Sequence, residues 1–306
     1  MAPDAIHPSS DEIEAATNEW AIEQGLTGRN ASEFHSARFP RLAARMFPDS
    51  PVERVSAYAR WVVLLFALDD RNEEHRPQPD SIHDLYRQLE AALSRPASPP
   101  HDPLVQNIQE QWRQLPDRMS SAWRDRFIRH LLLHGQAAAW EARLRVAHLI
   151  PSPAAFMDLR PWANGLFPWD LIETVHPYEV PVRAARTLPW RCLTLCSNHI
   201  TAWRNDIYSF AKESAIDNHN NYVSVIARAC GCDLLEATEF VEEQISVCTR
   251  ELIDYEHALH QQSVTLTKTE RRALTEIATT CRTMTAAHAR WVIESGRYPT
   301  AQMPDG

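Results

Sequence analysis

Residues 205–213 read Asn-Asp-Ile-Tyr-Ser-Phe-Ala-Lys-Glu and place an amide, a hydroxyl and a carboxylate at every fourth position. At the period of an α-helix, Asn205, Ser209 and Glu213 share one face, and Lys212 stands one step round from it. Oxygen donors on one face suit Mg²⁺, which prefers oxygen ligands and completes its octahedron with waters and phosphates. The pattern predicts a magnesium-binding helix. An ordinary amphipathic helix with a polar outer face is the alternative that this stretch alone leaves open.

A second group of carboxylates follows an almost continuous apolar run, residues 61–68, which predicts a buried helix. Asp69 and Glu73 are four residues apart, as are Asp70 and Glu74, so like charges repel on neighbouring ridges unless a cation neutralises them. Acidic groups at the carboxyl end of a helix also oppose its dipole. Local conflicts of this kind are expected at functional sites. A solvated acidic cap is the simpler alternative, but it leaves the preceding apolar run unexplained.

The two stretches together resemble the metal-binding motifs of class I terpene synthases of the microbial type. Residues 69–74, Asp-Asp-Arg-Asn-Glu-Glu, are similar to the aspartate-rich motif, with Glu where many members have Asp, and residues 205–213 match the whole Asn/Ser/Glu motif. Arg160 stands where the diphosphate-sensing arginine of that family would lie. Arg297 and Tyr298, near the carboxyl terminus, are a further feature that agrees with this resemblance. The resemblance extends from about Trp61 to Tyr298.

The resemblance implies an all-α fold, a single-domain helical bundle around a central apolar cavity over residues 1–306. Residues 1–8 are expected to be a disordered lead and residues 299–306 a tail. The composition agrees, because seven glycines in 306 residues leave few tight turns and 44% hydrophobic residues supply a large core. No segment shows strand alternation of comparable strength.

Helices are predicted wherever apolar residues recur at the helical period. Ser9 and Glu12 predict a capping box at the first helix. Pro161 disfavours helical geometry at Arg160 and Gly165 permits a tight bend, so a helix should break between them. The predicted helices cover residues 9–25, 34–47, 52–73, about 82–93, 104–149 with an interruption near Pro116, 189–213, 222–229, 233–262 and 267–295.

By this resemblance, the chain is a carbon–oxygen lyase that ionises an acyclic prenyl diphosphate with Mg²⁺ and cyclises the carbocation, releasing diphosphate. Farnesyl diphosphate is favoured as the substrate, and geranyl or geranylgeranyl diphosphate stay open. The implied metal ligands, for a cluster of three ions, are Asp69, Asp70, Glu73, Glu74, Asn205, Ser209 and Glu213. The implied diphosphate contacts are Arg160, Lys212, Arg297 and Tyr298. Gly165 is our choice for the helix-break carbonyl, with Asn164 as the alternative, and Ala163 stands where a small polar residue is usual.

Aromatic faces are the physical means of stabilising a carbocation, because they attract a cation without offering a nucleophilic lone pair. Phe66, one turn before the acidic motif, and Trp291, six residues before Arg297, are the aromatic residues predicted to do so. Packing is the alternative for each of them. Trp162, Phe167 and Trp203 are weaker candidates.

Two other functions are alternatives to terpene cyclisation. A prenyl chain-elongating transferase shares the ionisation chemistry and the helical fold, but that family carries a second aspartate-rich motif where this chain has Asn/Ser/Glu. A non-catalytic helical interaction protein would leave both acidic faces without a purpose. Terpene cyclisation is therefore the preferred prediction and chain elongation the second.

Composition excludes several other classes. A net charge of −9 disfavours nucleic-acid binding, which requires clustered basic residues. The six cysteines form no zinc pattern and are expected to be reduced, packed thiols, and packing or the surface is expected for His130 and His134. The amino terminus lacks a signal peptide and no run is long enough for a membrane span, so a cytoplasmic protein, monomeric or homodimeric, is expected.

Overall fold

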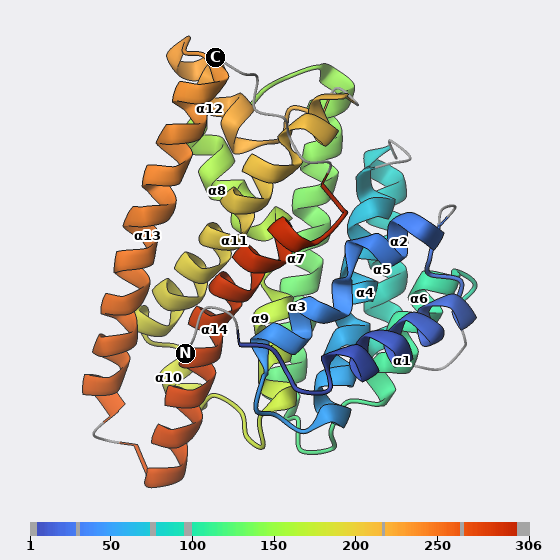
Figure 1. The fold of residues 1–306 in the computed structure, drawn as a ribbon, viewed down its shortest axis with the longest axis vertical. Helices are drawn as coiled ribbons and strands as arrows, with labels where there is room; N and C mark the ends of the chain where they lie inside the picture. The colour runs from blue at the N-terminus through green and yellow to red at the C-terminus, as the bar shows by residue number, and fades with distance from the viewer. Residues whose placement is uncertain are drawn as a thin grey trace.

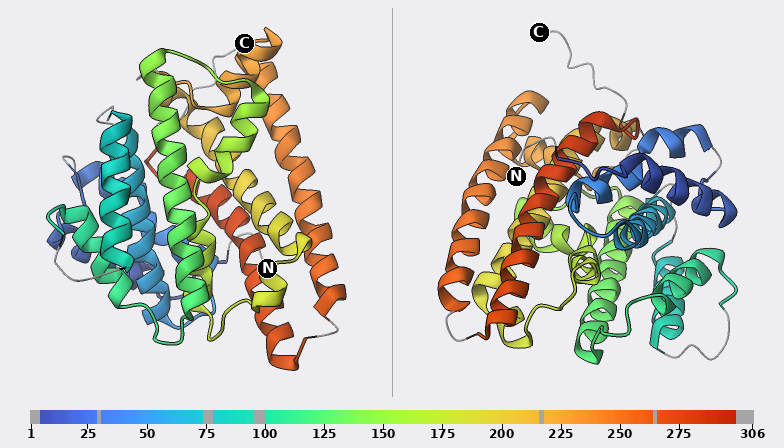
Figure 2. Two further views of the ribbon diagram at one scale, coloured as in Figure 1. Left: turned by 180° about the vertical axis from the view of Figure 1, so that it is seen from behind. Right: turned by 60° about the horizontal axis from the view of Figure 1, so that its bottom comes forward.

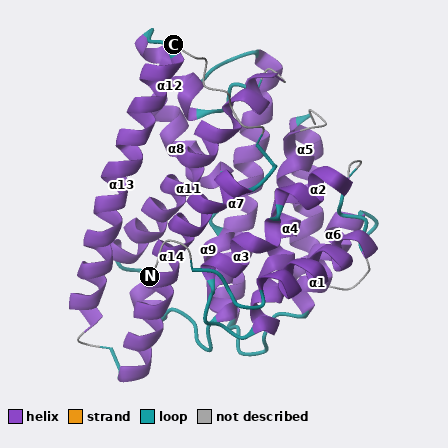
Figure 3. Ribbon diagram, in the orientation of Figure 1, coloured by secondary structure: helices purple, strands orange, loops and turns teal. Residues whose placement is uncertain are grey.

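The computed structural model describes residues 5–28, 31–73, 78–94, 100–215, 218–263 and 266–298. Within these ranges every regular element is a helix, as the colouring in Figure 3 shows. The all-α prediction is confirmed. None of the described helices combines the length and the hydropathy that crossing a bilayer requires.

The helices carry the labels of Figure 1. They are α1 (Ser10–Glu23), α2 (Ala31–Ala37), α3 (Phe39–Met46), α4 (Val52–Glu73), α5 (Pro79–Ser94), α6 (Pro103–Arg113), α7 (Ser121–Ala147), α8 (Pro153–Ala163), α9 (Phe167–Val175), α10 (Val182–Ala185), α11 (Leu188–Ala215), α12 (Tyr222–Cys230), α13 (Leu234–Gln262) and α14 (Lys268–Glu294).

The helices form a bundle with α7 near its middle. Figure 1 shows α13 along one edge and α1 and α6 along the other, and both views in Figure 2 again show these helices at opposite edges. Helix α11 packs against both α13 and α14, while α4 packs against α3, α6 and α9. The space between α4 and α11 is bordered by α7, α8 and α9, which brings the two acidic stretches of the sequence toward each other.

Most predicted helices agree with the structure, and α4 begins and ends at the predicted residues. Two details were wrong. The Ser9 side chain makes no capping hydrogen bond, since the Ser9 backbone N–H donates instead to His7 Nδ1 at 3.0 Å. The predicted helix over residues 34–47 is two helices, because Arg38 between them adopts left-handed backbone geometry with φ of 50°.

The predicted break at Arg160 lies one turn later. Helix α8 continues through Pro161, and its end is closed by the Asn164 N–H, which donates to the Arg160 carbonyl at 2.9 Å. The chain then turns at Gly165, where φ is +78° and a Cβ atom would lie 2.9 Å from the Phe167 ring. Glycine is therefore required at this bend.

Helices α9 and α10 were not predicted. Every residue of α9 is buried, so its sequence, FPWDLIETV, has no exposed polar face to mark a helical period. Helix α10 is a single turn after a proline.

Candidate functional site

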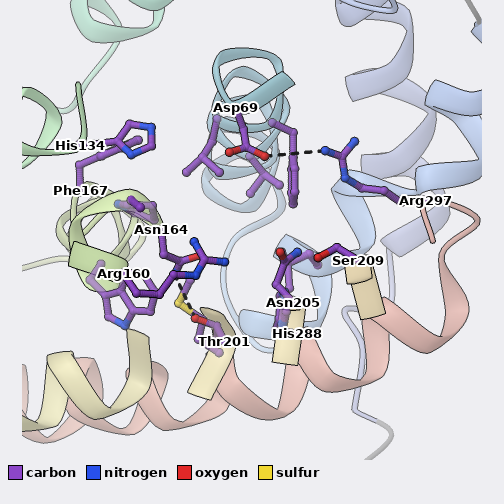
Figure 4. A pocket seen from close by; sticks show the side chains of 18 of the residues that line it. Asp69, His134, Arg160, Asn164, Phe167, Thr201, Asn205, Ser209, His288 and Arg297 are labelled. Atoms are coloured by element: carbon purple, nitrogen blue, oxygen red, sulfur yellow. Dashed lines mark hydrogen bonds and ion pairs between the residues drawn. The ribbon is translucent and has the colours of Figure 1, made fainter. Parts of the chain in front are cut away.

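One pocket collects most of the residues that the sequence singled out. It has an ionic end and an apolar wall, and its lining comes from helices α3, α4, α7, α8, α9, α11 and α14 and from the residues after α14. Figure 4 shows Asp69 on one side of the pocket and Asn205 and Ser209 on the other. The polar lining is Asp69, His134, Glu141, Arg160, Asn164, Thr201, Asn205, Ser209, Lys212, Glu213, Asn220, His288, Arg297 and Tyr298. The apolar lining includes Leu42, Met46, Val62, Leu65, Phe66, Phe167, Trp169 and Met284.

We call Asn205, Ser209 and Glu213 the α11 rim, and all three line the pocket. Ser209 and Glu213 are 3% and 7% exposed. The Asn205 amide donates to the Tyr298 hydroxyl at 2.5 Å, and Glu213 accepts from the Asn221 amide at 2.9 Å. These bonds fix two of the three side chains from outside the helix.

The α11 rim has the properties of a cation site. The buried Ser209 hydroxyl makes no hydrogen bond of normal geometry with any described residue. Burial, together with the neighbouring Asp206 carboxylate, raises the pKa of Glu213 to about 7, although Arg160 acts in the opposite direction. An unpartnered hydroxyl beside a poorly neutralised carboxylate fits a hard divalent cation with oxygen ligands.

We call Asp69 and Asp70 the α4 rim. Here the carboxylates already have cationic partners: Arg297 Nη2 lies 2.7 Å from Asp70 Oδ1 and 3.8 Å from Asp69 Oδ2, and Lys212 Nζ lies 3.9 Å from Asp70 Oδ1. Burial would lower the pKa of Arg297, but Asp70 outweighs it and raises that pKa. The two rims thus face each other, and among the described residues ion pairs are formed by the carboxylates of the α4 rim and not by Glu213.

The side chains of Glu73 and Glu74, the last two residues of the acidic motif, are not described by the structure. Glu73 is the last residue of α4, but its side chain lies outside the described part of the chain, as does all of Glu74. Their roles as metal ligands stay predictions from the sequence.

Arg160 is held by a residue that the sequence did not single out. Its guanidinium donates through Nε to Asp206 Oδ2 at 3.1 Å and through Nη2 to Asp206 Oδ1 at 2.5 Å. Asp206 is fully buried and also accepts from the Tyr222 backbone N–H at 3.2 Å. Although burial acts to lower the pKa of Arg160, Asp206 raises it and keeps the guanidinium charged. The bidentate contact fixes the direction of the arginine at the pocket.

The helix break favours Asn164 over Gly165 as the residue that faces the pocket. Asn164 and Ala163 are part of the lining, and the Asn164 amide donates to Thr201 Oγ1 at 3.4 Å. The Gly165 carbonyl accepts from the buried Asn198 amide at 2.7 Å. Gly165 therefore shapes the bend, and our choice of it for the pocket-facing carbonyl needs correction.

Of the two aromatic residues predicted to stabilise a carbocation, Phe66 lines the pocket and Trp291 does not. Phe66 lines the pocket, stacks on Phe39 with ring centroids 4.4 Å apart, and has the Arg297 guanidinium 4.8 Å from its ring. Trp291 is not part of the lining: it is 1% exposed, packs behind Phe66 at 5.2 Å and donates its indole N–H to the Ala37 carbonyl. Trp291 therefore does not reach the pocket, where it was predicted to contact the carbocation, and instead packs against Phe66, which does.

Of the weaker aromatic candidates, Phe167 lines the pocket, and Trp162 and Trp203 do not. Trp169, which the sequence did not indicate, lines it as well. Its indole N–H donates to Ser197 Oγ at 2.9 Å, so its position is fixed by α11.

Three further titratable groups line the pocket without having been predicted there. His134 and Glu141 are seven residues apart on one face of α7, a spacing that could have linked them, and His288 lies on α14. Burial lowers the pKa of His288 to about 3 and raises the pKa of Glu141 to about 7. His134 donates from Nδ1 to the Trp162 carbonyl at 3.1 Å, so its expected packing role includes the pocket wall, whereas His130 pairs with Asp170.

Comparisons with known proteins agree with this geometry. The family model described as terpene synthase family 2, C-terminal metal binding, matches residues 60–251. The chain is 29% identical over 240 residues to a (+)-T-muurolol synthase of Roseiflexus castenholzii, covering 77% of this chain and 74% of that protein. It is 26% identical over 312 residues to a 7-epi-alpha-eudesmol synthase of Streptomyces viridochromogenes, covering 96% and 90%. The names of both relatives state that they cyclise (2E,6E)-farnesyl diphosphate.

Solved structures show the same fold at lower sequence identity. The crystal structure of germacradien-4-ol synthase from Streptomyces citricolor superposes with a TM-score of 0.84 at 20% identity, covering 95% of this chain and 99% of the other.

Proposed function

The chain belongs to terpene synthase family 2, and we propose that it converts farnesyl diphosphate into a cyclic sesquiterpene hydrocarbon or alcohol. As a terpene synthase it is a lyase that releases diphosphate. The observation that carries the proposal is the pocket with two oxygen-bearing rims at one end and an apolar, aromatic wall at the other. Such a pocket suits a substrate with an anionic head and a hydrocarbon tail. Relatives that cyclise farnesyl diphosphate support this choice of chain length.

We propose Mg²⁺ as the metal, in a cluster of three ions. Asp69 would hold it on the α4 rim, assisted by Asp70, and Asn205, Ser209 and Glu213 on the α11 rim. The unpartnered Ser209 hydroxyl supports this assignment. Bound Mg²⁺ supplies positive charge that stabilises the departing diphosphate.

Cationic side chains would complete the diphosphate site. Arg160 is aimed at the pocket by Asp206, so it can accept an anion without first being reoriented. Arg297 and Lys212 are paired with Asp70, whose side chain is 30% exposed, and can exchange this carboxylate for an arriving diphosphate without losing an anionic partner. Tyr298 presents a hydroxyl at the same end of the pocket.

The proposed reaction begins when the carbon–oxygen bond of the substrate breaks and its electron pair leaves with diphosphate. The resulting allylic carbocation lies against the pocket wall, where Phe66, Phe167 and Trp169 offer aromatic faces and no nucleophile. Cyclisation ends when a proton is lost, giving a hydrocarbon, or when water adds, giving an alcohol. The apolar lining keeps bulk water from the cation until that step.

We propose that residues 1–306 act as one catalytic domain. Helices on both sides of the family match, α3 with Leu42 and Met46 and α14 with Met284 and His288, line the same pocket, which supports one unit. The lining comes from one chain, so a monomer and a homodimer with two separate sites are both compatible with the proposed chemistry.

The test is incubation of the purified protein with Mg²⁺ and geranyl, farnesyl or geranylgeranyl diphosphate, with volatiles identified by gas chromatography and mass spectrometry. We expect diphosphate release and a cyclic product from farnesyl diphosphate. A longer prenyl diphosphate formed only when isopentenyl diphosphate is added would establish chain elongation instead. Absence of diphosphate release from all three substrates would contradict both activities.

A further inference from the structure

A second group of metal-ligating side chains lies on the opposite face of α11 from the pocket. Cys196 precedes Asn205 by nine residues, which is half a turn in projection along a helix. Cys196 points toward α13, against which α11 packs, and meets Cys248 and Glu251 there. None of these residues lines the pocket of the proposed reaction.

The three ligand atoms form a compact group. Cys196 Sγ, Cys248 Sγ and a Glu251 carboxylate oxygen all lie within 4.8 Å of one another, and the Cys196 thiol donates to Glu251 Oε2 at 3.8 Å. The two cysteines are 6% and 7% exposed, and both are free thiols. Glu251 is exposed, so the group is open to solvent on one side.

His199 supplies an independent sign that a ligand belongs here. It follows Cys196 by three residues on the same face of α11 and lies beside Cys248. Its side chain is 9% exposed, and its buried Nε2 has no hydrogen-bond partner among the described residues. The ring is held by stacking on Trp203 at 4.5 Å. A buried imidazole nitrogen without a partner is costly unless something binds it.

We propose that Cys196, Cys248, His199 and Glu251 form a zinc site that joins α11 to α13. Two thiolates, one imidazole and one carboxylate are a ligand set that Zn²⁺ favours and Mg²⁺ does not. A tetrahedral zinc with Zn–S bonds of about 2.3 Å separates its sulfur ligands by roughly 3.8 Å. The spread of up to 4.8 Å among the Cys196, Cys248 and Glu251 ligand atoms therefore closes with small side-chain movements, and His199, which stands outside that spread, must turn toward the metal to complete the tetrahedron.

The site would act as a structural clamp. Helix α11 carries the α11 rim on its other face, so a metal that fixes α11 against α13 also fixes the position of that rim. Binding replaces the two thiol protons with the metal, and these protons leave to solvent. No redox step is involved.

The test uses the full-length protein, reduced and stripped of metal, titrated with Co²⁺ and then with Zn²⁺ in the absence of diphosphate. We expect one equivalent of Co²⁺ to produce a thiolate-to-cobalt charge-transfer band and tetrahedral d–d bands, and one equivalent of Zn²⁺ to abolish them. Cys196→Ser and Cys248→Ser should lose the charge-transfer intensity, and His199→Gln should weaken Co²⁺ binding by at least about tenfold.

Two controls separate this site from others. Cys230→Ser removes an exposed thiol outside the group and should leave the titration unchanged. Glu213→Gln, on the α11 rim, should also leave it unchanged. The proposal is overturned if the wild-type protein shows no charge-transfer band or if the band survives in Cys248→Ser. It is also overturned if Cys196 and Cys248 pair as a disulfide once reductant is removed in the presence of Zn²⁺.

Discussion

The α4 rim and the α11 rim face the same pocket, yet they are built in opposite ways. On the α11 rim Ser209 and Glu213 are 3% and 7% exposed, and Glu213 forms no ion pair with a residue that the structure describes. On the α4 rim the Asp69 and Asp70 side chains are 40% and 30% exposed and pair with Arg297 and Lys212. The α11 rim has two of its three oxygen ligands held by hydrogen bonds before a metal binds, whereas the α4 rim must release its cationic partners first.

The difference assigns different tasks to the two rims. Burial and the Asp206 carboxylate destabilise the Glu213 anion and raise its pKa to about 7, so a divalent ion that ligates this carboxylate is strongly favoured. Partly exposed ion pairs cost little to break. We infer that the α11 rim sets the position of the metal, while the α4 rim ligates it after its carboxylates have released Arg297 and Lys212.

The substitution Glu213→Gln is the strongest test of the different tasks assigned to the two rims. The substitution keeps the shape and removes the charge, and we expect turnover of farnesyl diphosphate to fall by roughly 1000-fold because a fixed ligand of the stabilising charge is lost. Circular dichroism should show unchanged helical content. Glu243→Gln, at an exposed position on α13, is the matched control and should keep wild-type turnover. A Glu213→Gln enzyme with more than about a tenth of wild-type activity would contradict the metal assignment.

Asp206→Asn tests the buried network behind the α11 rim. It leaves the Arg160 guanidinium buried without its partner anion, so we expect the free energy of unfolding to fall by about 3 kcal/mol. Urea denaturation followed by circular dichroism measures it. A loss below about 1 kcal/mol would mean that solvent or another anion compensates Arg160.

The pH dependence of Mg²⁺ binding sharpens the contrast further. Protonated Glu213 cannot ligate a metal, and its pKa lies at about 7, so metal affinity should fall as the pH drops through that value. From pH 8 to pH 6 we expect the Mg²⁺ dissociation constant to rise about tenfold. Isothermal titration calorimetry with wild-type protein measures it, and an affinity independent of pH in this window would place the metal elsewhere.

Asp70→Asn should have the smallest effect. The Asp70 side chain is 30% exposed, and Asp69 at 3.8 Å remains as an anion beside the buried Arg297, so we expect a change in the free energy of unfolding of less than about 1 kcal/mol. Parallel urea titrations of Asp70→Asn and Asp206→Asn compare the α4 rim with the buried network behind the α11 rim. Equal losses of stability in the two variants would remove the distinction between the exchangeable ion pairs of the one and the buried ion pair of the other.

The sequence was sufficient for the parts of the site that lie on one regular helix. The spacing of Asn205, Ser209 and Glu213 placed them on one face, and the apolar run before Asp69 identified α4, because helical periodicity converts sequence distance into direction. Both predictions needed only local information.

The parts that depend on packing were not accessible in the same way. The sequence predicted that Arg160 contacts the substrate diphosphate. It gave no sign that Asp206, forty-six residues later, would bind the Arg160 guanidinium. Pro161 was expected to end α8, but the helix continues past it. Trp291 stood near the right motif and still lies behind Phe66, because burial order within a core depends on neighbouring helices. Proximity in sequence did not decide which aromatic face reaches the pocket.

The most direct test of the account is a diffraction experiment on crystals grown with Mg²⁺ and inorganic diphosphate. We predict divalent ions between the rims, coordinated by Asp69 on one side and by Asn205, Ser209 and Glu213 on the other, with the diphosphate contacting Arg160. Ions held by only one rim, or a diphosphate bound outside this pocket, would contradict it.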